Sequence, residues 1–434
     1  MVPPLRQAFA TLLVMLLVAP RPAAAEPPVA EYMIYQYPGA ALVVIVDARE
    51  TEFTAKITGP ERALLTEASV AGRRIGPVWL YVDSTDRPRQ LMVRVQAERA
   101  VEREAIGMEL MQLSMADSNA RQQAQAYRLL AHGMQRVYAD DTSTWAQRGQ
   151  SLRNAAPAFA ALGMERMRLW ADFYAAHLVL HRLDDVVTSL EMTDRIDRAA
   201  RRAGFEDIAL SNHVLLTEAL LRGADKTAGS RSEDYYRRAH EELQALAERA
   251  GALGFRGEQG RALYRDGAAW ERQGDLARAV GRYEQALAIT AQTSDTDLLN
   301  RIRATAAVAY EAQGSTSGAI GLLEDIADDL PVVASADEER AKTLYEKGRL
   351  LNQTYRHGEA ATVLDEALRL QRDSPLVSQW GRTGLELGWA LYALGDLDQA
   401  RRVLLDSLPR AADAGAAERA RAYGALAHIA RFEG

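Results

Sequence analysis

Four basic side chains recur along the C-terminal half of the sequence at nearly constant spacing, and side chains of this type bind carboxylates. Successive bases are 40, 41 and 40 residues apart. The four bases are Arg261, Arg301, Lys342 and Arg382. Aromatic residues on the same helical face are Tyr264, Tyr345, Trp389 and Tyr392. A row of cations between aromatic side chains could hold an extended peptide through charge-assisted hydrogen bonds to its acidic groups, together with apolar contact.

The same bases also have a simpler interpretation. They could pair with acids on neighbouring helices, such as Glu271 and Glu311, and contribute to solubility alone. For the surface as a whole we favour binding, because a long face of this kind has no other evident use.

The sequence contains no recognisable motif for catalysis, phosphate binding or metal binding. The patterns GxxxxGK[ST], HExxH, GxSxG and SxxK are all absent. The segment from Gly314 to Gly318 imitates a nucleophile elbow, but Thr316 stands at its centre. His177 and His181 are four residues apart and could offer two metal ligands, but no carboxylate lies between them. We interpret them as surface or groove histidines, and we expect no catalytic residue, no cofactor and no metal.

The residues around the four bases repeat as helical hairpins. Small residues occur at positions 267, 307, 348 and 388, which are again 40, 41 and 40 residues apart. In each copy a large residue follows after three residues, the turn after seven and an alanine after twelve, which is helical spacing on both sides of a turn. One such hairpin cannot bury its apolar face alone, so we expect the copies to stack on one another.

This pattern resembles tetratricopeptide repeats of the longer kind found in bacterial regulators and sensors. The resemblance covers residues 256–413, as four clear units. It implies a mainly α fold, a right-handed α-solenoid whose first helices line a concave groove. It also implies that the four bases and four aromatic residues face this groove, with Phe173 and His177 further upstream. The arrangement is similar in principle to the carboxylate clamp of some tetratricopeptide co-chaperones, although the asparagines of that clamp are missing from the matching positions.

Helical spacing continues on both sides of the four clear units. Residues 98–255 are expected to form degenerate hairpins of the same type, with a polar loop inserted at 224–234 and a kink at Pro157. Residues 414–434 indicate one further helix. It is either a solvated cap or the first half of another hairpin.

The segment 37–97 has a different pattern, with short apolar runs separated by turn residues. We expect a small β-sandwich here, preceded by a lead-in at 26–36. Its turn signals, such as Pro38-Gly39 and Gly76-Pro77, make it similar to the prepeptidase-type sandwich that precedes tetratricopeptide arrays in exported bacterial proteins. Trp79 and Tyr81 lie on one face of an expected strand, where they could stack on a glycan or fill the core.

Residues 1–25 are typical of a signal peptide, since Arg6 precedes an apolar run and Ala23 to Ala25 form a small-residue cleavage site. The run is too short for a comfortable membrane span, and the chain has no cysteine for lipid attachment. After cleavage the chain would carry 50 bases and 59 acids, a net charge of −9, which disfavours nonspecific nucleic-acid binding. We therefore expect a periplasmic or secreted protein without stable membrane insertion.

Three functions remain open at this point. The leading hypothesis is a non-enzymatic exported scaffold that binds a partner protein or peptide in the groove. The alternative is the recognition or regulatory half of a larger or split enzyme, because similar signal, sandwich and repeat arrangements precede CHAT peptidase domains, and related arrays precede signalling output domains. A third hypothesis is glycan or peptidoglycan binding by the sandwich through Trp79 and Tyr81.

Overall fold

The chain divides into two compact units, Met1–Phe255 and Arg256–Gly434, which we call unit 1 and unit 2. The structure, a computed structural model, describes residues 29–48, 53–69, 76–97, 106–134, 142–331, 336–371, 377–411 and 414–433. The predicted signal peptide at 1–25 lies outside these residues. None of the helices in the described ranges is long and apolar enough to span a bilayer.

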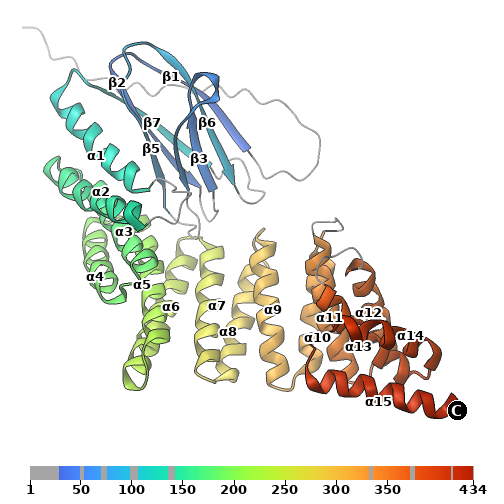
Figure 1. The fold of residues 1–434 in the computed structure, drawn as a ribbon. Helices are drawn as coiled ribbons and strands as arrows, with labels where there is room; N and C mark the ends of the chain where they lie inside the picture. Colours follow the sequence, from blue (N-terminus) through green and yellow to red (C-terminus); the bar gives the residue numbers. More distant parts are fainter. Residues whose placement is uncertain are drawn as a thin grey trace, which may run out of the picture. The chain divides into compact units, whose positions relative to one another are not determined.

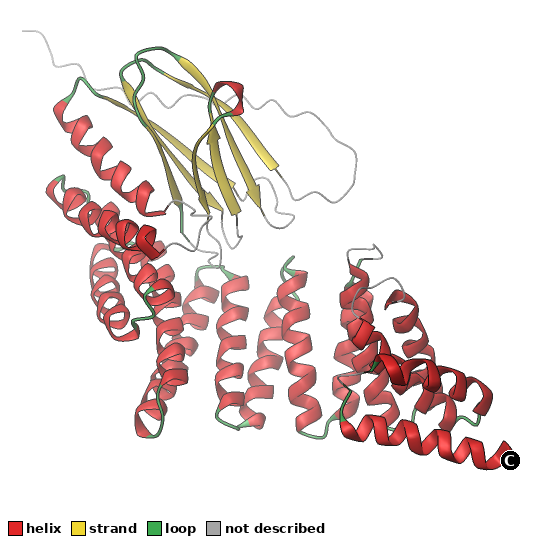
Figure 2. Cartoon of the chain, in the orientation of Figure 1, coloured by secondary structure: helices red, strands yellow, loops and turns green. Residues whose placement is uncertain are grey.

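The described part of unit 1 begins with two antiparallel sheets that form a sandwich (Figures 1 and 2). The strand order is β1-β6-β3-β4 in one sheet and β5-β2-β7 in the other. In β3, Phe53, Ala55 and Ile57 are buried and the residues between them are partly exposed. Every second side chain of the strand therefore fills the space between the two sheets. The strands are β1 (Val29–Gln36), β2 (Ala40–Ala48), β3 (Phe53–Thr58), β4 (Leu64–Ser69), β5 (Val78–Val82), β6 (Arg89–Ala97) and β7 (Ile106–Ser114).

The sandwich extends beyond the expected interval 37–97 at both ends. Strand β1 lies in the expected lead-in and pairs with β6 along its whole length. Strand β7 occupies residues that we expected to be helical and pairs with β2 from Ala40↔Ser114 to Ala48↔Ile106. A short apolar run such as that of β7 fits a helix or a strand by its local pattern, and here the long-range pairing with β2 decides. The first helix therefore begins at Ser118.

The described part of unit 1 also contains six α-helices. They are α1 (Ser118–Met134), α2 (Thr142–Ala161), α3 (Glu165–Arg182), α4 (Val186–Ala203), α5 (Glu206–Lys226) and α6 (Ser230–Ala252). Pro157 lies inside α2. The residues 224–234, expected as a loop, are mostly helical, because α5 continues through Lys226 and α6 already begins at Ser230. The two helices approach closely there, since a Cβ atom added at Gly223 would lie 3.0 Å from the Tyr235 ring.

Unit 2 consists of helices in successive antiparallel hairpins (Figure 1). The helices are α7 (Arg256–Arg272), α8 (Leu276–Thr290), α9 (Thr296–Ala312), α10 (Thr316–Asp329), α11 (Asp337–Gln353), α12 (His357–Gln371), α13 (Val377–Ala393), α14 (Leu397–Ser407) and α15 (Ala416–Glu433). We call α7, α9, α11, α13 and α15 the first helices, because each opens a hairpin of the predicted register. Gly395 has a φ of +85° in the turn between α13 and α14, and Asp396 then caps α14 by accepting a hydrogen bond from Gln399 N.

The small residues of the repeat allow the two helices of each hairpin to approach closely. A Cβ atom added at Gly348 would lie 2.4 Å from Leu364 Cγ, and one added at Gly388 would lie 2.5 Å from Leu404 Cγ. At Gly267 the corresponding contact is with Tyr283, at 2.6 Å. In all three hairpins the contacting residue is sixteen positions after the glycine. This geometry confirms the register predicted from the sequence.

Candidate partner-binding face

Successive first helices of unit 2 contact each other directly through polar side chains. Tyr264 Oη on α7 lies 3.3 Å from Thr305 Oγ1 on α9. Arg349 on α11 donates two hydrogen bonds to the carboxylate of Glu311 on α9, at 2.8 and 2.7 Å. These bonds hold the pKa of Glu311 below its usual range. We call the surface formed by α7, α9, α11, α13 and α15 the first-helix face, and the four predicted bases and four predicted aromatic residues of unit 2 belong to its helices.

Arg261 joins two helices and is not an open cation. Its side chain is buried, with the residue only 7% exposed. The guanidinium donates to Glu258 at 2.6 Å on its own helix and to Asp295 at 2.5 Å before α9. Asp295 also caps α9 by accepting a hydrogen bond from Leu298 N. The ion pair between Arg261 and Asp295 therefore connects α7 to the start of α9.

Arg382 and Tyr345 contact each other across α11 and α13. The guanidinium carbon of Arg382 lies 5.3 Å from the centroid of the Tyr345 ring, and Arg382 also forms an ion pair with Glu418 at 3.4 Å. Tyr345 is 7% exposed, and its buried hydroxyl has no hydrogen-bond partner among the described residues. Burial raises the pKa of this hydroxyl to about 12, although the charge of Arg382 opposes the rise.

We expect Tyr345→Phe to change stability at pH 7 by less than about 1 kcal/mol, because the hydroxyl that it removes is unpartnered. At high pH the variant should become more stable than the wild type. The unfolded tyrosine ionises near pH 10 and the folded one near 12, so the wild type loses stability between these values. Urea unfolding at pH 7 and at pH 11 measures both effects. A variant that is clearly less stable than the wild type at pH 11 would contradict this account.

Trp389 and Tyr392 contact the last helix of the chain. The guanidinium carbon of Arg421 on α15 lies 5.9 Å from the centroid of the Trp389 ring. Tyr392 Oη lies 2.8 Å from Nδ1 of His428, also on α15. Helix α15 therefore packs against α13 as the next helix of the first-helix face (Figure 1).

A buried polar network joins α11, α13 and α15, and its central members Asn352, Glu386 and Arg421 are not among the residues predicted from the sequence. Glu386 on α13 is 2% exposed. It accepts a hydrogen bond from Asn352 Nδ2 at 3.0 Å and forms an ion pair with Arg421 at 2.6 Å. A sequence signal exists, because Arg421 follows Glu386 by 35 residues and Glu418 follows Arg382 by 36, close to the repeat length.

Arg301 and Lys342 differ from the other predicted cations. Both are exposed, and neither forms an ion pair with a described residue. Other basic residues of α9 and α11 are paired with acids. These pairs are Arg303 with Asp325 and Asp329, Arg340 with Glu366, Lys347 with Glu324, and Arg349 with Glu311 and Glu346. Glu271, the other acid considered as a partner for the predicted bases, instead accepts a hydrogen bond from Tyr283 Oη at 2.6 Å.

The remaining predicted groove residues are largely occupied by contacts within the protein. Tyr264 is partly buried, and its ring centroid lies 5.9 Å from that of Tyr283. In unit 1, Phe173 is fully buried in the core. The ring centroids of His177 and His181 lie 4.1 Å apart with the planes tilted by 36°, and His181 lies 3.2 Å from Glu218. In the described part of the chain, no group of three or more His, Cys, Asp or Glu side chains is arranged to hold a metal.

Trp79, considered above as a glycan-stacking residue, lies in the core of unit 1. It is 2% exposed. Its ring centroid lies 5.8 Å from that of Trp170 and 6.0 Å from that of Tyr174, both on α3. Tyr81 is partly buried and packs against the same core. Trp79 therefore fixes the sandwich to the helices and offers no face to a sugar.

Comparisons with known proteins place this fold among helical-repeat structures. No protein-family model and no curated protein sequence matches the chain. A signal-transduction ATPase from Pyrococcus horikoshii with a tetratricopeptide repeat sensor is 12% identical, with a TM-score of 0.50 over 67% of this chain and 43% of that one. BtubC from P. vanneervenii is 17% identical, with a TM-score of 0.39 over 52% of this chain and 91% of that one. The apo quorum sensor NprR from B. thuringiensis is 15% identical, with a TM-score of 0.35 over 67% of this chain and 80% of that one.

The likeness to the Pyrococcus protein concerns the fold, and this chain spans less than half of that protein's length. It agrees with the hairpins, the turn glycines and the close helix contacts described above. The helical part of the chain is an α-solenoid of tetratricopeptide-type repeats, preceded by a β-sandwich.

Proposed function

We propose that the first-helix face of unit 2 binds an extended acidic segment of a partner protein and that Arg301 and Lys342 hold its carboxylates. The chain would then act as a non-enzymatic interaction scaffold. The observation that supports this proposal most strongly is the contrast in pairing. Arg301 and Lys342 are exposed and form no ion pair with a described residue, whereas Arg261 and Arg382 are joined to acids of neighbouring helices.

The chemistry around the two cations suits an extended acidic peptide. Arg301 and Lys342 occupy equivalent positions in successive hairpins, so each can meet a different carboxylate of one segment. On α9 the side chain of Val308 lies two turns from Arg301 and is 59% exposed, which provides apolar contact beside the charge. The curvature of stacked hairpins creates extended concave surfaces that bind such segments.

One further observation supports a recognition role, and another supports a location outside the cytoplasm. The repeats of the Pyrococcus protein are described as a sensor, and this supports recognition by analogy of fold. The segment 1–25 has the composition of a signal peptide, so we propose that the partner is met in the periplasm or outside the cell.

Selection of displayed random peptides against residues 26–434 tests the proposal. We expect the enriched peptides to contain at least two acidic residues. Their affinity should fall roughly tenfold to a hundredfold in the double variant Arg301→Glu and Lys342→Glu, because two charge-assisted contacts become repulsive. Fluorescence anisotropy with a labelled selected peptide measures this change.

A charge-matched control changes two other exposed bases together to glutamate. They are Arg356, just before α12, and Arg369, within α12. This variant should bind the peptide nearly as well as the wild type. Enrichment of peptides without acidic residues, or equal loss of affinity in both double variants, would show that the proposed face is not the binding site.

The alternative, that the chain is the recognition half of a larger or split enzyme, is favoured by one observation. The Pyrococcus protein joins its repeat sensor to an ATPase within one chain. Under this alternative a selected partner would itself carry catalytic activity, and its turnover would change when this chain is added. Unchanged turnover at saturating concentrations would exclude it for that partner.

A further inference from the structure

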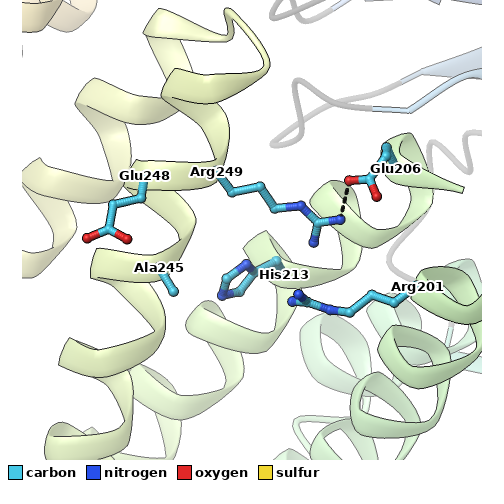
Figure 3. Close-up of a pocket in the computed structure, with 6 residues that line it drawn as sticks. All are labelled: Arg201, Glu206, His213, Ala245, Glu248 and Arg249. Atoms are coloured by element: carbon cyan, nitrogen blue, oxygen red, sulfur yellow. Dashed lines mark hydrogen bonds and ion pairs between the residues drawn. The ribbon is translucent and has the colours of Figure 1, made fainter. Parts of the chain in front are cut away.

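Unit 1 contains a pocket formed by residues of α4, α5 and α6 (Figure 3). Its volume is about 570 Å³. The residues that line it are Arg201, Glu206, His213, Ala245, Glu248 and Arg249. None of them belongs to the proposed partner-binding face, which lies in unit 2.

Two guanidinium groups enter this pocket from opposite walls, Arg201 from α4 and Arg249 from α6 (Figure 3). One terminal nitrogen of Arg249 donates to Glu206 at 2.5 Å. Its other terminal nitrogen, Nη1, is buried and has no hydrogen-bond partner among the described residues. A buried guanidinium nitrogen without an acceptor is costly, and a ligand carboxylate would supply the missing acceptor.

His213 of α5 provides a second unpartnered atom at the same pocket. The residue is 2% exposed, and its Nε2 lies 2.9 Å from a carboxylate oxygen of Glu242. The hydrogen bond with His213 holds the pKa of Glu242 below its usual range, so the carboxylate is ionised and Nε2 is the nitrogen that carries hydrogen. Nδ1 is buried and has no partner in the described part of the chain. A polar group of a ligand would supply the hydrogen-bond partner that this nitrogen lacks.

The charges around the pocket select the class of ligand. The lining carries two cations, Arg201 and Arg249, and two anions, Glu206 and Glu248. Arg201 is also bonded to Asp197, at 2.7 Å. A simple anion would satisfy Arg249 but would approach the lining carboxylates Glu206 and Glu248 unfavourably. A molecule with both a carboxylate and an ammonium group satisfies Arg249 Nη1 and compensates the lining carboxylates as well.

We propose that this pocket binds a free amino acid, with its carboxylate on Arg249 and its ammonium group compensating the lining carboxylates Glu206 and Glu248. The site is independent of the peptide face in unit 2. It would make unit 1 a receptor for a small metabolite.

The test is calorimetric titration of residues 26–434 with each of the twenty standard amino acids at concentrations up to 10 mM. We expect at least one to bind, and its N-acetyl and carboxamide derivatives to bind at least tenfold more weakly. Arg249→Gln should weaken binding by at least tenfold as well. Equal binding of the N-acetyl derivative would overturn the assignment of the ligand class, and absence of binding by all twenty would overturn the site.

A blocking variant separates the pocket from general effects on folding. Ala245→Trp would fill the pocket from the exposed surface of α6 and should abolish binding, whereas Ala160→Trp, at an exposed position of α2, should leave it intact. The Arg301→Glu and Lys342→Glu variant should bind the amino acid normally, so failure of the peptide proposal would leave this test valid. Retained binding in Ala245→Trp would show that the ligand lies elsewhere.

Discussion

A Gly388→Trp variant is expected to lose the native packing of its hairpin and to destabilise unit 2 by at least about 3 kcal/mol. Even a single Cβ atom at this position would lie 2.5 Å from two carbon atoms of Leu404, which is fully buried. Leu404 cannot move aside cheaply, because it belongs to a core cluster that includes Leu385 and Ala422. An indole ring would have to separate α13 from α14.

Thermal unfolding followed by circular dichroism measures the effect. A loss of about 3 kcal/mol corresponds to a fall of roughly 6–12 °C in the melting temperature of a unit of this size. The matched control is Gly281→Trp in α8, where an added Cβ atom would meet nothing within 4 Å. If both variants melted at the wild-type temperature, the assigned hairpin register would be wrong.

The second large effect is expected from Arg421→Ala. The variant would leave the carboxylate of Glu386, which is 2% exposed, with Asn352 as its remaining side-chain partner among the described residues. Removing one partner of a buried ion pair costs about 3–5 kcal/mol. The side chain of Arg421 is 40% exposed, so water can partly replace it, and we expect the lower part of this range.

Hydrogen exchange localises this effect, because α15 should lose protection before the rest of unit 2. Adding Glu386→Gln to the variant should restore much of the stability, since a neutral amide is cheaper to bury than an unpaired carboxylate. Arg419→Ala, at an exposed position of the same helix, should change stability by less than about 0.5 kcal/mol. Equal stability of the Arg421 and Arg419 variants would contradict the role assigned to the network.

The hairpin array could be predicted from the sequence because its determinants are local and repeated. The close contact of Gly388 with Leu404 follows from residues sixteen positions apart, and the same spacing occurs at Gly267 and Gly348. Strands β1 and β7 lie outside the expected sandwich because their partners are distant. The β7 residues pair with β2, and no pattern within 106–114 specifies that pairing.

The candidate site was only partly predictable for a related reason. In the sequence, Arg261, Arg301, Lys342 and Arg382 occupy equivalent positions, and nothing local distinguishes them. In the structure, Asp295 lies within reach of Arg261 and Glu418 within reach of Arg382, so two of the four bases become structural. Asp295 belongs to the next hairpin and Glu418 to α15. Whether these acids lie close enough to form ion pairs depends on how the helices pack.

A charge-swap binding measurement tests the central proposal most directly. The double variant Arg301→Glu and Lys342→Glu is titrated with a selected acidic peptide and with a second peptide in which every acidic residue is replaced by lysine. We predict that the variant loses the acidic peptide and binds the lysine peptide at least tenfold more tightly than the wild type does. If the variant gains no affinity for the lysine peptide and keeps its affinity for the acidic one, Arg301 and Lys342 do not contact the partner.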